Sequence, residues 1–96
     1  MKILVMEVSI RVSWVNSLKE KRMIVRSITQ RLKNKFNISI GEVSLQDNHK
    51  LIGIGLSSVC GTDAIADSTK EKIVNFIDDN CDGEIIDIFE EVVDYS

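Results

Sequence analysis

The sequence LVMEVSIRVSW, residues 4–14, is the strongest structural signal in this chain of 96 residues. Every even-numbered position in it is apolar, whereas the odd-numbered positions from Glu7 to Ser13 are polar or charged. Side chains alternate between the two faces of a strand, so this period of two predicts a strand with one buried face. The same parity predicts that Trp14 lies on the buried face.

A helix is expected directly after this strand. Ser17 is a suitable N-cap, and Glu20 three residues later completes a capping box by reaching back to the cap backbone. The apolar residues from Leu18 to Phe36 fall on one side of a helical wheel at about 100° per residue. Asn37 is expected to supply a left-handed cap at the end of this helix.

A second strand is expected over about residues 38–46. Its apolar positions change parity between Ile40 and Val43, which indicates a bulge near Gly41. The polar residues 47–50 then form a turn that leads to the next strand.

The remaining chain predicts a strand, a helix and a strand. The strand covers about residues 52–61, and Thr62 or Asp63 caps the helix. Gly83 ends this helix, and a last strand of uncertain register follows over about residues 84–93.

The order β-α-β-β-α-β predicts an α+β fold, the ferredoxin-like plait. Right-handed crossovers then give a four-stranded antiparallel sheet with both helices on one face. The length allows one domain, residues 1–96, with a single two-layer core. The other face of the sheet is left without helices.

Four short motifs stand out within this element order, namely SLKEKR at residues 17–22, RLKNKFN at residues 31–37, and the pairs Glu42-Val43 and Gln46-Asp47. With these motifs and this element order, the chain resembles the bacterial YlxP-like family, a domain of unknown function with a ferredoxin-like fold. The resemblance implies a link to translation, because in many bacteria the family's gene lies beside translation-factor and ribosome-maturation genes. It implies no catalytic residues.

Composition argues against a membrane protein or a secreted one. The longest stretch without a charge, residues 51–62, has 12 residues, whereas a membrane-spanning helix needs about 20 apolar ones. Glu7 and Arg11 interrupt the N-terminal segment, so it does not resemble a secretory signal, and a cytoplasmic location is expected. In that compartment Cys60 and Cys81 are expected to stay free thiols.

The residues that could support chemistry do not form a recognisable active site. His49 and Cys60 lie eleven residues apart along a strand, about 36 Å, so they cannot act together. Asp78, Asn80 and Asp82 match the first half of a calcium-binding loop, but the closing acid is missing. The sequence therefore predicts a non-enzymatic protein without cofactor or metal, and leaves open whether this acidic run binds any cation.

Charge is distributed unevenly along the chain. Residues 1–61 carry ten Lys and Arg against four acids, whereas residues 62–96 carry two against eleven. Seven of the twelve basic side chains lie between Lys19 and Lys35, where Glu20 is the only acid. Such a charge cluster is typical of a surface that meets a polyanion.

On a helical wheel Lys19, Arg22, Arg26 and Lys33 fall within about 60° of one another, clear of the apolar stripe. Lys19, Lys21 and Arg22 also lie in the first turn, where cations oppose the helix dipole unless an anion sits there. We therefore predict Lys19, Lys21, Arg22, Arg26 and Lys33 as phosphate-binding or RNA-binding residues. RNA or a ribosomal particle is the expected partner.

Two alternatives explain the same charges. Acids of the second helix, such as Asp67 and Glu71, could neutralise the basic row within the molecule, or the row could meet an acidic protein surface. An alternative function is that of a homodimeric protein-interaction domain, in which two copies pack through the open sheet face. That face is expected to present small or polar side chains and no stacking rings on its central strands, at Glu7, Ser9, Arg11, Gly53, Gly55 and Ser57.

Overall fold

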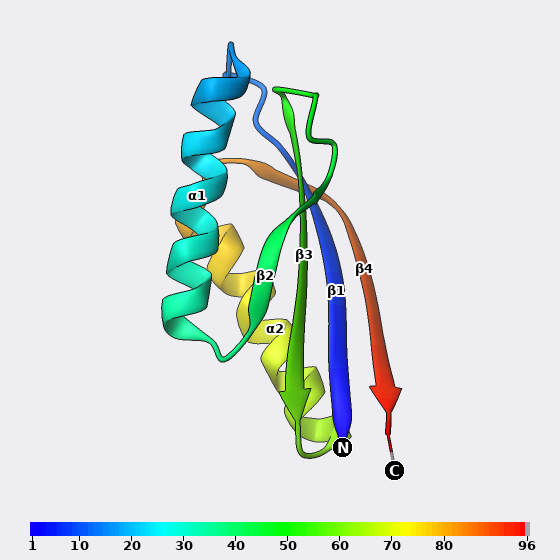
Figure 1. The fold of residues 1–96 in the computed structure, drawn as a ribbon. Helices are drawn as coiled ribbons and strands as arrows, with labels where there is room; N and C mark the ends of the chain where they lie inside the picture. The colour runs from blue at the N-terminus through cyan, green and yellow to red at the C-terminus, as the bar shows by residue number, and fades with distance from the viewer. Residues whose placement is uncertain (96) are drawn as a thin grey trace.

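The computed structural model describes residues 1–95. Four strands and two helices follow one another in the predicted order. Their bounds are β1 Lys2–Arg11, α1 Leu18–Lys35, β2 Ser39–Ser44, β3 Leu51–Cys60, α2 Asp63–Asn80 and β4 Glu84–Asp94. The strands form an antiparallel sheet in the order β2-β3-β1-β4, and both helices lie on one side of it (Figure 1). The predicted ferredoxin-like α+β fold is confirmed.

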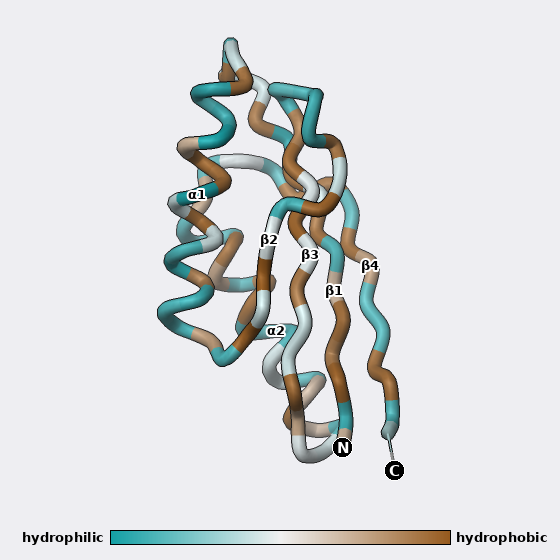
Figure 2. The backbone as a smooth tube through the Cα atoms, in the orientation of Figure 1, coloured by the Kyte–Doolittle hydropathy of each residue, from teal (hydrophilic) through white to brown (hydrophobic). Residues whose placement is uncertain are grey.

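β1 is a central strand and organises the core. It pairs with β3 on one side and with β4 on the other, and Leu4, Met6, Val8 and Ile10 are almost fully buried beneath the helices. Figure 2 shows how apolar and polar residues alternate along α1, whose apolar stripe packs on this face of the sheet. Burial of such a side chain contributes about 1.5–3 kcal/mol, so this face holds the two layers together.

The prediction that Trp14 is buried was wrong. β1 ends at Arg11, and the Val15 amide donates to the Val12 carbonyl over 3.0 Å in a tight turn. Val12 and Val15 are both fully buried, and a turn that directs these two side chains inward directs Trp14 outward. The indole is 46% exposed.

The predicted bulge in the second strand exists slightly further along the chain than expected. The pairing of β2 with β3 shifts between Glu42 and Ser44, so Val43 is the extra residue. The Val43 side chain lies over Gly55, where an added β-carbon would come within 2.8 Å of it. This contact explains why β3 carries glycine at that position.

The ends of the helices differ from the prediction in conformation. Phe36 caps α1 in an extended conformation, and Leu45 is the only non-glycine residue with positive φ in the part of the chain described, so Asn37 forms no left-handed cap. Gly83 does not have positive φ either. An added β-carbon on Gly83 would lie 2.6 Å from Ile10 Cγ2, so glycine is needed there for close packing.

No helix within residues 1–95 is both long enough and apolar enough to cross a membrane.

Candidate polyanion-binding surface on the first helix

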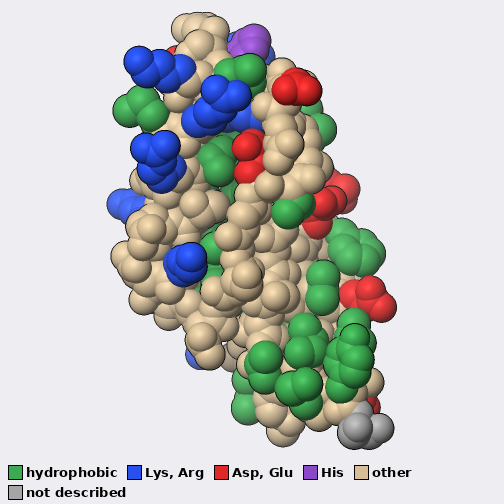
Figure 3. Space-filling view, viewed as in Figure 1, with side chains coloured by type: hydrophobic (Ala, Val, Ile, Leu, Met, Phe, Trp, Pro, Cys, Tyr) green, Lys and Arg blue, Asp and Glu red, His purple; other side chains and the backbone are tan. Residues whose placement is uncertain are grey.

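Four of the five predicted site residues lie together on the solvent side of α1. Lys19, Arg22, Arg26 and Lys33 are all exposed, and we call these four residues the α1 row. Figure 3 shows Lys and Arg side chains gathered on the α1 side of the molecule, away from most of the Asp and Glu side chains in that view. From Lys19 to Lys33 the row extends over about 21 Å of helix axis.

The acidic half of the chain does not neutralise the α1 row. Within residues 1–95 four of its acids pair with other cations, namely Asp63, Glu84, Glu90 and Asp94, and no carboxylate lies within ion-pair distance of any member of the row. The five ion pairs are Lys2–Asp63, Lys2–Asp94, Arg11–Glu84, Lys21–Glu42 and Lys70–Glu90. The row therefore keeps its positive charge facing solvent.

Three of these pairs tie β4 to its neighbours, among them Arg11–Glu84 at the start of the strand. The hydrogen bond from Lys2 Nζ to Asp94 Oδ2, 2.9 Å long, raises the pKa of Lys2 and lowers that of Asp94. A similar bond from Lys70 to Glu90 raises the pKa of Lys70. These acids hold the end of β4 against β1 and α2, and are not available to α1.

Two further cations of α1 contact α2 without using its carboxylates. Arg31 Nη1 donates to the Asn80 carbonyl over 3.2 Å, at the end of α2. Lys35 Nζ lies 5.6 Å from the centre of the Phe76 ring, a cation–π contact. The helices are thus joined by uncharged partners on the α2 side.

Lys21, the fifth predicted residue, does not belong to this surface. Its side chain is fully buried, and Nζ donates to the carbonyls of Leu45, Gln46 and Leu51 over 2.9, 3.2 and 3.2 Å. Nζ also lies 3.1 Å from Glu42 Oε2, outside hydrogen-bond geometry, so this contact is an ion pair. Lys21 holds the β2–β3 connection against α1 and cannot reach a phosphate.

The sequence held a signal for this burial. Lys21 precedes Val25 by four residues, Ile28 by seven and Leu32 by eleven, so it lies within the apolar stripe of the helix. Those three residues are buried in the structure. The position in the stripe, and not the charge, decides where the side chain lies.

The first turn of α1 is capped from within the molecule. Ser17 Oγ accepts from the Glu20 amide over 3.1 Å, as predicted, whereas Glu20 Oε2 accepts from the Asn16 amide, one residue before the expected partner. A cap of this kind occupies one of the free amides of the turn. An anion at α1 would therefore be bound mainly by side chains.

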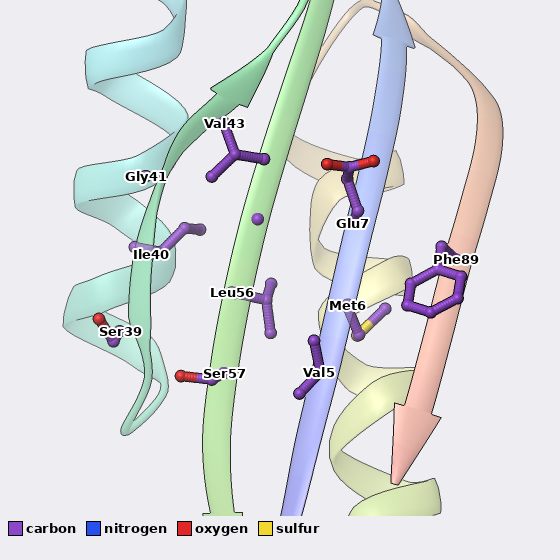
Figure 4. Close-up of a pocket in the computed structure, with 11 residues that line it drawn as sticks. Val5, Met6, Glu7, Ser39, Ile40, Gly41, Val43, Leu56, Ser57 and Phe89 are labelled. Atoms are coloured by element: carbon purple, nitrogen blue, oxygen red, sulfur yellow. The ribbon is translucent and has the colours of Figure 1, made fainter. Parts of the chain in front are cut away.

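The open sheet face carries no basic groove. A shallow groove of about 610 Å³ is lined by side chains from all four strands, among them Val5, Glu7, Val43 and Phe89 (Figure 4). No Lys or Arg lines it. Phe89 lies on this face and pairs across the strands with Glu7. The face is suited to apolar contact and not to phosphate.

Cysteine and acidic residues form no further site in the part of the chain that the structure describes. Cys60 and Cys81 are free thiols, and no group of three or more potential metal ligands comes together there. Asp78 and Asn80 lie within α2, so the acidic run is helical at its start and does not have the loop shape of a calcium site.

Sequence and fold comparisons place the chain among known proteins. Residues 3–89 match the family model described as "Protein of unknown function (DUF503)". The chain belongs to this family. It is 36% identical over 62 residues to the "Uncharacterized protein YlxP" of Bacillus subtilis (strain 168), which covers 65% of this chain and 67% of that protein. The predicted membership of the YlxP-like family is confirmed.

The fold also resembles a designed protein. The "De novo designed protein Foldit4" aligns with a TM-score of 0.54 over 98% of this chain and 99% of the designed one. At 14% sequence identity, this likeness concerns the fold alone.

Proposed function

We propose that this protein is a non-enzymatic binding module that contacts RNA, free or in a ribosomal particle, through the α1 row. The observation that carries the proposal is that Lys19, Arg22, Arg26 and Lys33 lie on one exposed helix face with no carboxylate partner in residues 1–95. Four unpaired cations in a line are suited to neighbouring phosphates of one backbone. A cytoplasmic location, where ribosomes are found, is part of this proposal.

The direct test is sedimentation of the protein with ribosomal particles at low and at high salt. Four phosphate contacts release counterions, so the logarithm of affinity should fall against the logarithm of salt with a slope of about −3 to −4. We expect the protein to sediment with the particles at low salt and to leave them at high salt. Sedimentation that is the same at both salt concentrations would contradict a phosphate-based contact.

A second candidate function is a homodimer formed through the open sheet face. The groove there offers apolar side chains from both edge strands, Val43 and Phe89, each more than half exposed. Glu7, Asp87 and Glu91 share this face by their register with β1, and would repel the same residues of a second copy. Salt should therefore strengthen this dimer, whereas it should weaken RNA binding.

Light scattering tests the dimer. If the open face is covered by a second copy, the mass is twice 10.8 kDa and Ser57→Glu returns it to the monomer value. Ser57 lies on this face opposite Val5, and is a cleaner site than Gly55, where any side chain would strike Val43. A monomeric mass at millimolar concentration and high salt rules the dimer out.

A further inference from the structure

Trp14 is held in solvent by the backbone around it. Lys50 Nζ donates to the carbonyls of Ser13 and Val15, over 2.7 and 2.8 Å, and the Val12 amide donates to the Lys50 carbonyl over 2.8 Å. The turn is thus fixed on both sides of the indole. A fixed turn holds the backbone of Trp14 in place before any ligand arrives, which lowers the entropic cost of binding.

The indole forms one wall of a groove at the side of α1. The groove has a volume of about 310 Å³, and we call it the Trp14 groove. Its other lining residues are Met23, Ile24, Ser27, Ile28, Asn80, Cys81 and Asp82. Met23 is 64% exposed, so a thioether and an aromatic ring together offer a polarisable apolar surface to solvent.

This groove runs along the α1 row. Met23 follows Lys19 by four residues and precedes Arg26 by three, and side chains at these spacings are neighbours on a helix, with about 5–6 Å between their β-carbons. A ligand whose phosphates meet the row would therefore place its adjoining groups at the rim of the groove. No other aromatic residue lines this groove.

The far side of the groove offers hydrogen-bond acceptors. Asn80 Nδ2 donates to the Phe76 carbonyl over 2.9 Å, which leaves Oδ1 as an acceptor. Asp82 forms no ion pair within residues 1–95. Its carboxylate repels phosphate, but it can accept from the amino group on the edge of a base. Charge therefore directs a phosphate towards α1 and an uncharged base into the groove.

We propose that the Trp14 groove receives an unpaired base of RNA, stacked on the indole, while the neighbouring phosphates lie along the α1 row. The inference rests on the proposed function and specifies which kind of RNA is bound. A base inside a regular duplex is stacked on its neighbours and cannot enter, so the ligand is single-stranded or bulged RNA.

Trp14 is the only tryptophan of the chain, so its fluorescence reports on the groove directly. The full chain is titrated with an oligoadenylate of about ten nucleotides, a length within the range that single-strand-binding domains cover. A blunt RNA duplex of the same length and inorganic polyphosphate are titrated in parallel. We expect the oligoadenylate to quench Trp14 emission, and polyphosphate to bind the row without quenching.

Two variants separate stacking from charge. Trp14→Ala should weaken oligoadenylate binding roughly 5- to 150-fold, the range expected from loss of one stacked base, with the slope against salt unchanged. Trp14→Phe should retain most of the affinity, because it keeps an aromatic face. Since the indole is 46% exposed, Trp14→Phe should melt close to the wild-type temperature and Trp14→Ala somewhat lower, so binding is measured well below both melting temperatures.

The outcomes distinguish this inference from the proposed function. If oligoadenylate binds with salt dependence but neither quenches Trp14 nor loses affinity in Trp14→Ala, the inference is overturned, whereas RNA binding through the α1 row still stands. Tighter binding of the duplex, or equal quenching by polyphosphate, also overturns it. If neither RNA nor polyphosphate binds at low salt, the proposed function itself fails.

Discussion

Replacing Lys21 by methionine is expected to lower the free energy of unfolding by about 3–5 kcal/mol, the effect of removing one member of a buried ion pair. The ammonium satisfies three carbonyls and faces a Glu42 side chain that is only 19% exposed. It also holds the connection where Leu45 has a φ of 59°, a conformation that is unfavourable for a residue with a β-carbon. Methionine fills the space but supplies no donor to the three carbonyls, of which that of Leu45 keeps only the Asn48 amide, 3.1 Å away.

Urea denaturation measures this change, and Lys19→Met is the matched control. It is the same substitution two residues away on the same helix, but at an exposed position without an ion pair in residues 1–95, and it should change stability by less than about 0.5 kcal/mol. The double variant Lys21→Met with Glu42→Gln should recover only part of the loss, because the carbonyls of Leu45, Gln46 and Leu51 still lack the bonds from the ammonium. A stability equal to that of wild type would show that the buried contacts are not made in solution.

The fold could be predicted from the sequence because each element carries its own periodic signal. The period of two over residues 4–14 predicted β1, and Ser17 and the pair Thr62 or Asp63 predicted the starts of the two helices. Ser17 and Thr62 are the caps, and their side chains accept from the amides of Glu20 and Ile65. Details of the connections could not be predicted in this way. The place of the bulge at Val43 depends on contact with Gly55 of β3, which is distant in sequence.

The candidate surface was predicted only in part, because helical periodicity gives the faces of α1 but not its contacts with distant segments. Helical geometry alone places Lys19, Arg22 and Arg26 on one face, and the structure agrees. Lys21 was misplaced because its charge was given more weight than its position among apolar neighbours, and its partners come from the β2–β3 connection. Trp14 was misplaced because periodicity does not show where a strand ends.

Reversing two charges of the α1 row is expected to abolish RNA binding without unfolding the protein. In Arg22→Glu with Arg26→Glu, two cations become anions at the centre of the row, and Lys19 and Lys33 are left beside repelling carboxylates. On a single strand each phosphate contact contributes about −0.7 to the slope of log affinity against log salt, so any residual binding at low salt should show a slope of about −1.4 or shallower in place of about −3. Filter binding or fluorescence anisotropy with the oligoadenylate measures both affinity and slope.

The matched control for charge is Lys72→Glu, because Lys72 is exposed, lies on α2 and has no ion pair in residues 1–95. If a general positive field attracted RNA, this reversal would weaken binding by about half as much as the double variant. Binding through a defined row predicts that Lys72→Glu has little effect, since charge interactions beyond a Debye length of about 8 Å are largely screened at physiological salt.

Ribosomal particles treated with ribonuclease distinguish an RNA partner from an acidic protein partner. If the protein still sediments with them and the double variant does not, the row meets an acidic protein surface and not RNA.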